Sequence, residues 1–226
     1  MAAQNLNETD HFPTSGGDLE ITFLGHGSLL FTYSGMYIYL DPFSRVADYS
    51  NLPKADILLI THEHGDHLDP DAIQKIITEN TSVVLTELAA RQMDGDFVMR
   101  NGDSQTVKGI HVQAVPAYNQ VHKRGDGTPF HPKGDGNGYT LTFGDRRVYI
   151  AGDTEDIPEM KTLQDIDIAF LPMNLPYTMT PEMAAEAARS FNPKVLYPYH
   201  FGETDTSILQ NLLKGSGIEV RIRKMA

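Results

Sequence analysis

The feature that most constrains this chain is a dense group of metal-ligating side chains directly after an apolar run. Residues 61–67 read Thr-His-Glu-His-Gly-Asp-His, so three histidines and one aspartate fall within six residues. The preceding segment, residues 56–60, reads Asp-Ile-Leu-Leu-Ile. A short continuous apolar run of this kind predicts a strand buried on both faces. The sequence therefore places the histidines at the C-terminal end of a buried strand.

The spacing within this cluster predicts a metal site. His62 and His64 are two residues apart and can face one point in a tight loop, while Asp66 and His67 can face a second point nearby. Because the chain has no Cys, any metal must be held by histidines and carboxylates. Such a ligand set suits Zn and admits Mn or Fe. The helical His-Glu-x-x-His zinc motif is absent, since Asp66 stands where its second histidine belongs.

Length and charge restrict the class of protein. With 226 residues, the chain fits a polar lead over residues 1–18 and a single domain over residues 19–226. A formal net charge of −12 disfavours a general nucleic-acid binder, because it repels phosphate backbones. A homo-oligomer is compatible with this composition.

Targeting signals are missing from the sequence as it stands. Its apolar runs fall far short of the roughly 20 residues that a membrane-spanning helix needs. Residues 1–17 are polar and contain no apolar signal core, which predicts a cytoplasmic protein. A periplasmic protein trimmed of its signal would look the same.

Local patterns predict strands in two groups with helices between and after them. Asp69 and Thr180, each followed by Pro, predict the N-caps of two helices. Because strand-rich halves are each followed by helices, we expect an α/β (α+β) fold, a four-layer αβ/βα sandwich. Strands are expected at 19–24, 28–33, 36–40, 56–60, 82–86, 97–100, 110–117, 139–143, 146–151, 166–171, 195–199 and 218–222, and helices at 70–79, 181–190 and 206–213.

The cluster at residues 61–67 resembles the HxHxDH signature of the metallo-beta-lactamase superfamily, and the later elements resemble that family in their order. Asp153, in Ala-Gly-Asp-Thr, matches the aspartate that bridges two metals in that family. His200, in Tyr-Pro-Tyr-His-Phe-Gly, matches its last histidine. The resemblance implies the metallo-beta-lactamase fold and two divalent ions, Zn or Mn, with Fe as an alternative. It also implies the ligands of each ion: His62 and His64 for the first, Asp66, His67 and His200 for the second, and Asp153 for both.

One ligand departs from the family pattern. Where related hydrolases have a third histidine on the first metal, this chain has Asn119. The long loop over residues 118–137 offers His122 and His131 instead. The string Phe-His-Pro-Lys-Gly around His131 resembles a lactonase-like branch of the superfamily, which favours His131. His122 and Asn119 remain the alternatives.

Two further motifs resemble the same branch. His26, in Leu-Gly-His-Gly-Ser, resembles an element of ascorbate-6-phosphate lactonase-like and N-acylphosphatidylethanolamine phospholipase D-like hydrolases. In those proteins the histidine lies beside the metals, which implies a catalytic or substrate contact for His26. A buried turn histidine is the plainer alternative. Asp41, in Asp-Pro-Phe, is expected to orient a ligating histidine, or else to cap a turn.

The resemblance implies hydrolysis by a hydroxide held between two metals, with Asp66 accepting a hydrogen bond from it. The substrate would be a lactone, an ester or a phosphodiester. In the long loop, Lys123, Arg124 and Lys133 favour a small anionic substrate, although a solvated charged loop would look the same. The segment 174–180, which contains Tyr177, is expected to form a second wall.

Two other functions are kept as alternatives. The first is iron-dependent redox chemistry on the same fold, but the flavodiiron pattern replaces the second histidine by Glu, whereas this chain has His64. The second is a phosphodiesterase or nuclease, which the acidic balance disfavours when the substrate is a nucleic acid.

Overall fold

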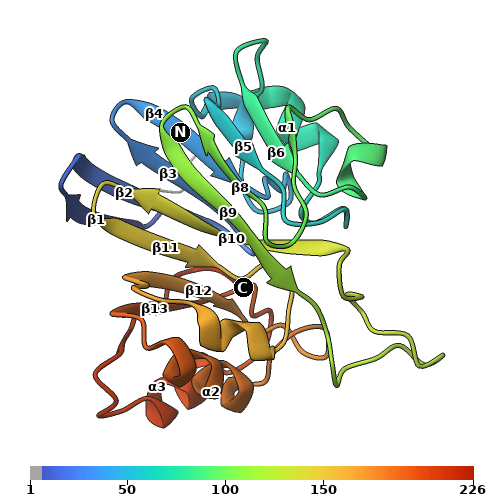
Figure 1. Cartoon of the computed structure of the whole chain (residues 1–226), viewed down its shortest axis with the longest axis vertical. Coiled ribbons are helices and arrows are strands. Elements are labelled where there is room, and N and C mark those ends of the chain that lie inside the picture. Colours follow the sequence, from blue (N-terminus) through green and yellow to red (C-terminus); the bar gives the residue numbers. More distant parts are fainter. Residues whose placement is uncertain (1–6) are drawn as a thin grey trace, which may run out of the picture.

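The computed structural model describes residues 7–226, and residues 1–6 of the polar lead lie outside this description. Two seven-stranded sheets pack face to face, with helices on their outer sides (Figure 1). The first sheet runs in the order β1 (Thr9–Thr14), β2 (Gly17–Gly25), β3 (Ser28–Tyr33), β4 (Met36–Leu40), β5 (Ile57–Leu59), β6 (Ser82–Leu85) and β7 (Phe97–Val98). The second runs in the order β14 (Glu219–Val220), β13 (Val195–Tyr199), β12 (Ile168–Pro172), β11 (Arg146–Ile150), β10 (Gly136–Phe143), β9 (Ile110–Ala117) and β8 (Ser104–Val107).

In the described part of the chain, three α-helices and three short 3-10 turns accompany these sheets. Among residues 7–226, no helix has the length and apolar character needed to cross a bilayer. The helices are α1 (Pro70–Ile76), α2 (Pro181–Phe191) and α3 (Thr206–Leu212), and the 3-10 turns are η1 (Tyr49–Asn51), η2 (Ala89–Arg91) and η3 (Pro158–Thr162).

Three buried apolar layers hold the fold together. The central layer lies between the two sheets, where the rings of Phe31 in β3 and Phe143 in β10 stack with centroids 5.8 Å apart. An outer layer joins α1 to the first sheet through Ile73 and Leu58, among others. The other outer layer joins α2 to the second sheet, for example through Ala185 and Leu171. Three apolar interfaces separate four layers, as the sequence predicted.

Most expected elements are present, and the differences have local causes. Both predicted N-caps are confirmed, since Asp69 accepts from the backbone N–H of Asp71 and Thr180 from that of Met183. The first helix ends three residues earlier than expected. Ile77 is extended, and Thr81 Oγ1 accepts from the backbone N–H of Thr78 in a turn that replaces the last helical residues.

Two edge strands were not expected from the sequence. Strand β1 consists of alternating exposed and half-buried residues, and the first three residues of β8 are exposed. Neither segment carries the apolar alternation that identifies a strand with a buried face. Strand β1 forms because it pairs antiparallel with β2 in register, from Thr9 opposite Thr22 to Thr14 opposite Gly17. Strand β8 likewise pairs with β9, so each of these strands forms a hairpin with the next strand of the chain across a two-residue turn.

An ion cluster at Asp10 joins β1, at the edge of the first sheet, to the segment after β14 in the second. Arg223 donates to both carboxylate oxygens of Asp10 at 2.7 Å, and the Tyr197 hydroxyl donates to the same group. Burial alone would raise the pKa of this carboxyl, but Arg223 and Tyr197 outweigh it and lower the pKa below its usual range. Stability from Asp10 is therefore present above the unfolded pKa, near 4, and is lost as the pH falls through the lower folded value.

We expect Asp10→Asn to lower the free energy of unfolding by about 1–3 kcal/mol at pH 7, because charge-assisted hydrogen bonds are lost. The cost should shrink as the pH falls below about 4, where the wild-type carboxyl begins to protonate. Urea unfolding at several pH values measures both effects. Asp18→Asn, an exposed substitution in β2, is the control and should change little. A cost that does not vary with pH would contradict the ionic explanation.

Candidate metal centre

The expected site residues come from strand ends of both sheets. The cluster at residues 61–67 follows β5, while Asp153 follows β11 and His200 follows β13. His131 lies on the long loop after β9. Because parallel strands end at a common edge of each sheet and the sheets pack face to face, these segments meet in one place. This arrangement matches the positions that the sequence predicted.

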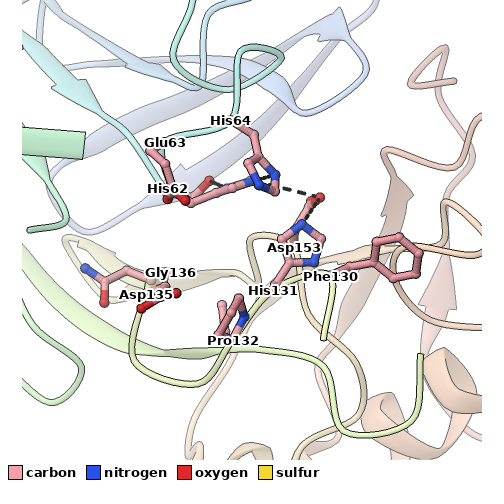
Figure 2. A pocket seen from close by; sticks show the side chains of 12 residues that line it. His62, Glu63, His64, Phe130, His131, Pro132, Asp135, Gly136 and Asp153 are labelled. Atoms are coloured by element: carbon pink, nitrogen blue, oxygen red, sulfur yellow. Dashed lines mark hydrogen bonds and ion pairs between the residues drawn. The ribbon is translucent and has the colours of Figure 1, made fainter. Parts of the chain in front are cut away.

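The first group of candidate ligands consists of His62, His64 and His131. Each offers a ring nitrogen, and these nitrogens lie within 4.8 Å of one another. His62 Nε2 and His64 Nδ1 are 3.1 Å apart. Figure 2 shows the rings of His62 and His64 close together and the ring of His131 next to the Asp153 carboxylate. Three converging imidazoles from two segments can hold one transition metal.

The second group consists of His26, Asp66, His67 and His200, whose ligand atoms also lie within 4.8 Å of one another. Asp66 Oδ2 lies 3.1 Å from His26 Nε2, 3.6 Å from His200 Nε2 and 3.8 Å from His67 Nε2. Asp66 lies on the solvent-accessible side of this group, because its side chain is 39% exposed whereas His67 and His200 are buried. The carboxylate therefore faces the side from which a substrate can approach.

Asp153 lies between the two groups. Its Oδ2 is 3.3 Å from His131 Nε2, 3.7 Å from His200 Nε2 and 4.0 Å from His62 Nε2. Its Oδ1 is 3.6 Å from His67 Nε2. One buried carboxylate thus contacts histidines of both groups, so the two groups form a single site.

The donor atoms fit a metal ion. Among residues 7–226, the buried atoms without a hydrogen-bond partner include His67 Nε2, Asp153 Oδ1 and both ring nitrogens of His200. A buried polar atom left unpaired costs about 1–3 kcal/mol, so these atoms need another partner. A divalent cation would pair with His67 Nε2, Asp153 Oδ1 and His200 Nε2, which face one point. His200 Nδ1 lies on the opposite side of its ring and is not explained by the ion. Imidazole with carboxylate is a donor set that Zn and Mn accept.

Asp41 fixes the orientation of His67, as expected from the sequence. Its Oδ2 accepts from His67 Nδ1 at 2.8 Å, which leaves Nε2 free to face Asp153. The same carboxylate accepts from the backbone N–H and the hydroxyl of Thr61, at 2.8 Å and 2.5 Å. A ligating histidine held in this way keeps one tautomer and one ring position.

The loop after β9 brings His131 to the first group and turns His122 away. His131 Nδ1 donates to Asn119 Oδ1 at 2.8 Å, so Asn119 orients the histidine, and its Nδ2 points to the Tyr177 carbonyl. His122 Nδ1 lies 2.9 Å from the carbonyl oxygen of Thr178 and 2.9 Å from Glu155 Oε1. His122 is thereby tied to the neighbouring loop, outside both ligand groups.

Electrostatic coupling within the cluster is strong. Burial alone would raise the pKa of Asp153, but His200 and His67 outweigh it and hold the pKa well below its usual range. Burial lowers the pKa of His67, while Asp153 and Asp41 more than compensate and raise it to about 9. His62 is different, because burial dominates and its pKa falls well below the usual value. The buried carboxylates of Asp153 and Asp41 therefore favour positive charge at the site.

His26 is the member of the second group that comes from the turn after β2. Its ring centroid is 3.7 Å from that of His200, and burial lowers the pKa of the imidazole. The next residue must be small, since a Cβ at Gly27 would lie 3.1 Å from His67 Cε1. Glycine at position 27 therefore lets the backbone that carries His26 approach the metal-facing histidines.

The two expected walls contact each other, and two of the three basic side chains of the long loop contact other residues of the chain. Tyr177 is 44% exposed and packs edge-on against Phe130, with ring centroids 5.0 Å apart. Lys133 Nζ is 2.6 Å from Glu159, and Arg124 lies over the Phe130 ring at 5.2 Å. Lys133 thus has an anionic partner within the chain, which weakens its predicted role as a substrate contact.

Sequence reasoning missed Glu155, a buried carboxylate that contacts the start of the long loop. The only signal in the sequence was an acidic residue two positions after Asp153. Nothing local distinguishes such a residue from a solvated one, because its partners are about 35 residues away along the chain.

Comparison with known proteins identifies the family to which this fold belongs. Residues 20–200 match the family described as the beta-lactamase superfamily domain. A UPF0173 metal-dependent hydrolase from Koribacter versatilis is 35% identical over 201 residues, which cover 81% of this chain and 84% of the relative. Another from Methanopyrus kandleri is 30% identical and covers 90% of this chain and 95% of the relative.

A solved structure is similar over nearly the whole chain. A candidate metal-dependent hydrolase from Parabacteroides distasonis superposes with a TM-score of 0.93 at 53% identity, covering 97% of this chain and 100% of that chain. This chain therefore belongs to the metal-dependent hydrolases of the metallo-beta-lactamase superfamily, together with the UPF0173 proteins.

Proposed function

We propose that this enzyme hydrolyses a small anionic lactone, ester or phosphodiester at a site that holds two divalent ions, Zn or Mn. The observation that carries the proposal is the position of Asp153, whose carboxylate contacts histidines of both ligand groups. A structural metal site is normally closed by four protein ligands, whereas hydrolytic sites keep a position open for water or substrate. Asp66 is half-exposed, so water or a substrate can reach the site at this residue.

The residues divide into two ligand sets. His62, His64 and His131 would hold the first ion, and Asp66, His67 and His200 would hold the second. Asp153 would contact both. Bound together, two ions in such a site activate water at neutral pH and polarise the attacked carbonyl or phosphoryl oxygen.

The side chains around the ions have supporting roles. Burial would raise the pKa of Asp66, but hydrogen bonding to His200 and His26 outweighs it and lowers that pKa strongly. Asp66 is therefore a carboxylate at neutral pH, and its Oδ2 can accept a hydrogen bond from the attacking water and orient it. His26 Nε2 lies 3.1 Å from the same oxygen and would hold Asp66 in place while its ring borders the bound substrate. Asp41 and Asn119 keep two ligand rings in position.

Charge at the site favours an anionic substrate. Two divalent ions would carry four positive charges, and the carboxylates of Asp41, Asp66 and Asp153 would cancel three of them. The remaining positive charge would attract an anionic group, although the chain as a whole has a net charge of −12. The aromatic pair of Phe130 and Tyr177 provides an apolar surface next to the loop that carries His131.

Metal content is the first test. Protein purified without a chelator is expected to contain up to two transition-metal equivalents per chain by inductively coupled plasma mass spectrometry. Metal-free protein should take up two equivalents of Zn²⁺ or Mn²⁺ on titration, and activity should return with them. No uptake on titration would exclude the dinuclear site.

A hydrolysis screen with Zn²⁺ or Mn²⁺ present tests the proposed substrate class. The panel comprises phosphorylated lactones, cyclic and bis-phosphodiesters, and neutral esters and thioesters of matched size. We expect the anionic members to be hydrolysed faster than their neutral counterparts, and the preference to decrease as salt screens the attraction. A uniform preference for neutral substrates would contradict the charge argument while leaving the hydrolase class intact.

A further inference from the structure

We propose that Glu155 is a positioning residue that fixes His131, the third histidine of the first ligand group, by acting through Asn119. The inference rests on the proposed function, because it assumes that His131 binds the first metal. Glu155 touches neither ligand group, and its effect would pass through a chain of hydrogen bonds.

The first link is a buried carboxylate that gathers consecutive backbone donors. Glu155 is fully buried, and its two oxygens accept the backbone N–H groups of Gln120, Val121 and His122 at 2.7, 2.7 and 2.6 Å. Successive N–H groups that converge on one anion hold a loop in one conformation. Burial would raise the pKa of this carboxyl, but these donors outweigh it and keep the pKa below its usual range. Glu155 is therefore an anion at neutral pH.

The second link passes from Glu155 to Asn119. Asn119 Nδ2 donates to Glu155 Oε1 at 3.2 Å and to the Tyr177 carbonyl at 2.9 Å. Both partners are acceptors, so they determine which end of the amide carries the NH₂ group. The other end, Oδ1, must then point the opposite way, toward His131.

The third link passes from Asn119 to the ligand. Asn119 Oδ1 accepts the backbone N–H and the Nδ1–H of His131, each at 2.8 Å. Because Nδ1 carries the proton, Nε2 is the free nitrogen, and it lies 3.3 Å from Asp153 Oδ2. A reversed amide would place two donors against two donors at His131. The orientation of Asn119 therefore selects both the tautomer and the direction of the His131 ring.

Glu155 also connects this loop to the residue between the two ligand groups. It lies two positions after Asp153, and its backbone N–H donates to the Tyr118 carbonyl at 3.0 Å. Thr154 Oγ1 also bonds the backbone of Tyr118. The segment 153–155 thus carries a metal-facing carboxylate at one end and the anchor of the His131 loop at the other. This geometry keeps Asp153 and His131 at a fixed separation.

A purely structural role for Glu155 predicts a different result from a positioning role. If the carboxylate only stabilises the loop, its loss should lower the unfolding temperature without distinguishing between the two metals. If it positions His131, its loss should weaken the first metal selectively, because within residues 7–226 no hydrogen bond or ion pair joins His26, Asp66, His67 or His200 to this loop. Stepwise metal affinity separates the two roles.

The test is Zn²⁺ titration of metal-free full-length protein by isothermal calorimetry, with circular dichroism and thermal unfolding alongside. Glu155→Gln keeps the shape but places an NH₂ group against backbone donors. We expect one site to keep its wild-type affinity and the other to weaken by about 10–100-fold, the usual cost of losing an outer partner of a metal ligand. Glu159→Gln is the matched control, because Glu159 bonds Lys133 and the Tyr118 hydroxyl and makes no contact with Asn119.

Asn119→Ala should weaken the same site, and the double variant should be no weaker than the more affected single variant, because both residues act in one chain. If Glu155→Gln does not fold, Glu155→Asp, which keeps the charge but shortens the reach, provides the comparison. Two unchanged affinities, or equal loss at both sites, would overturn the positioning role. A wild-type protein that binds fewer than two Zn²⁺ ions would instead contradict the proposed function.

Discussion

Asp153→Asn is expected to lower kcat by at least roughly 10³-fold, because it removes the only carboxylate within residues 7–226 that contacts both ligand groups. The change keeps the size of the side chain but removes its negative charge, which would be shared by two cations. Loss of several kcal/mol of electrostatic stabilisation corresponds to a rate change of this order. Metal content should also fall, because Asp66 would be the one charged ligand left to compensate two divalent ions.

The measurement is kcat on the best substrate from the screen, with metal content determined on the same sample. Asp156→Asn is the matched control, since Asp156 lies on the same segment outside both ligand groups. The control should retain near wild-type activity and metal. An Asp153→Asn variant with two tightly bound metals and normal turnover would remove the basis of the dinuclear proposal.

His131→Ala and His122→Ala should differ sharply, although the two histidines lie on the same loop. His131 offers a nitrogen to the first ligand group, whereas His122 Nδ1 lies within hydrogen-bond distance of the Thr178 carbonyl and of Glu155. We expect His131→Ala to lose one metal equivalent and to reduce kcat by about 10²-fold or more, since even an outer partner of a ligand costs 10–100-fold. His122→Ala should keep both metals.

Metal analysis and kinetics on the two purified variants provide the comparison, and thermal unfolding shows whether either change disturbs the fold. Adding excess Zn²⁺ should restore part of the His131→Ala activity, because a weakened site fills by mass action. If His122→Ala lost the metal and His131→Ala kept it, the assignment of the third histidine would be reversed.

Much of the site could be predicted because its signals are local in the sequence. His62, His64, Asp66 and His67 stand within one short loop after an apolar strand, and no fold is needed to see that they lie together. Asp153 and His200 were predicted by resemblance to a family, and the structure brings both to the same point. The helix caps at Asp69 and Thr180 were also predictable, because capping depends on neighbouring backbone groups.

The strands that were missed show where apolar patterning fails. Segments 9–14 and 104–107 have little apolar character, and they become strands because the next strand of the chain offers unpaired backbone groups at the sheet edge. Each is joined to that strand by a two-residue turn, at residues 15–16 and 108–109. The apolar alternation within a segment does not indicate such a pairing, because edge strands of this kind bury few side chains.

By itself, the sequence predicted a metal site built from histidines and carboxylates, and a layered fold of strands and helices. The tertiary structure decided which loop histidine joins the first group, turning His131 inward and tying His122 to the neighbouring loop. It also brought the Glu155 carboxylate into hydrogen-bond contact with that loop and paired Lys133 with Glu159. The physical reason is the same each time. The residue type of a candidate ligand can be seen in the sequence. The direction in which its side chain points depends on hydrogen bonds to residues far away along the chain.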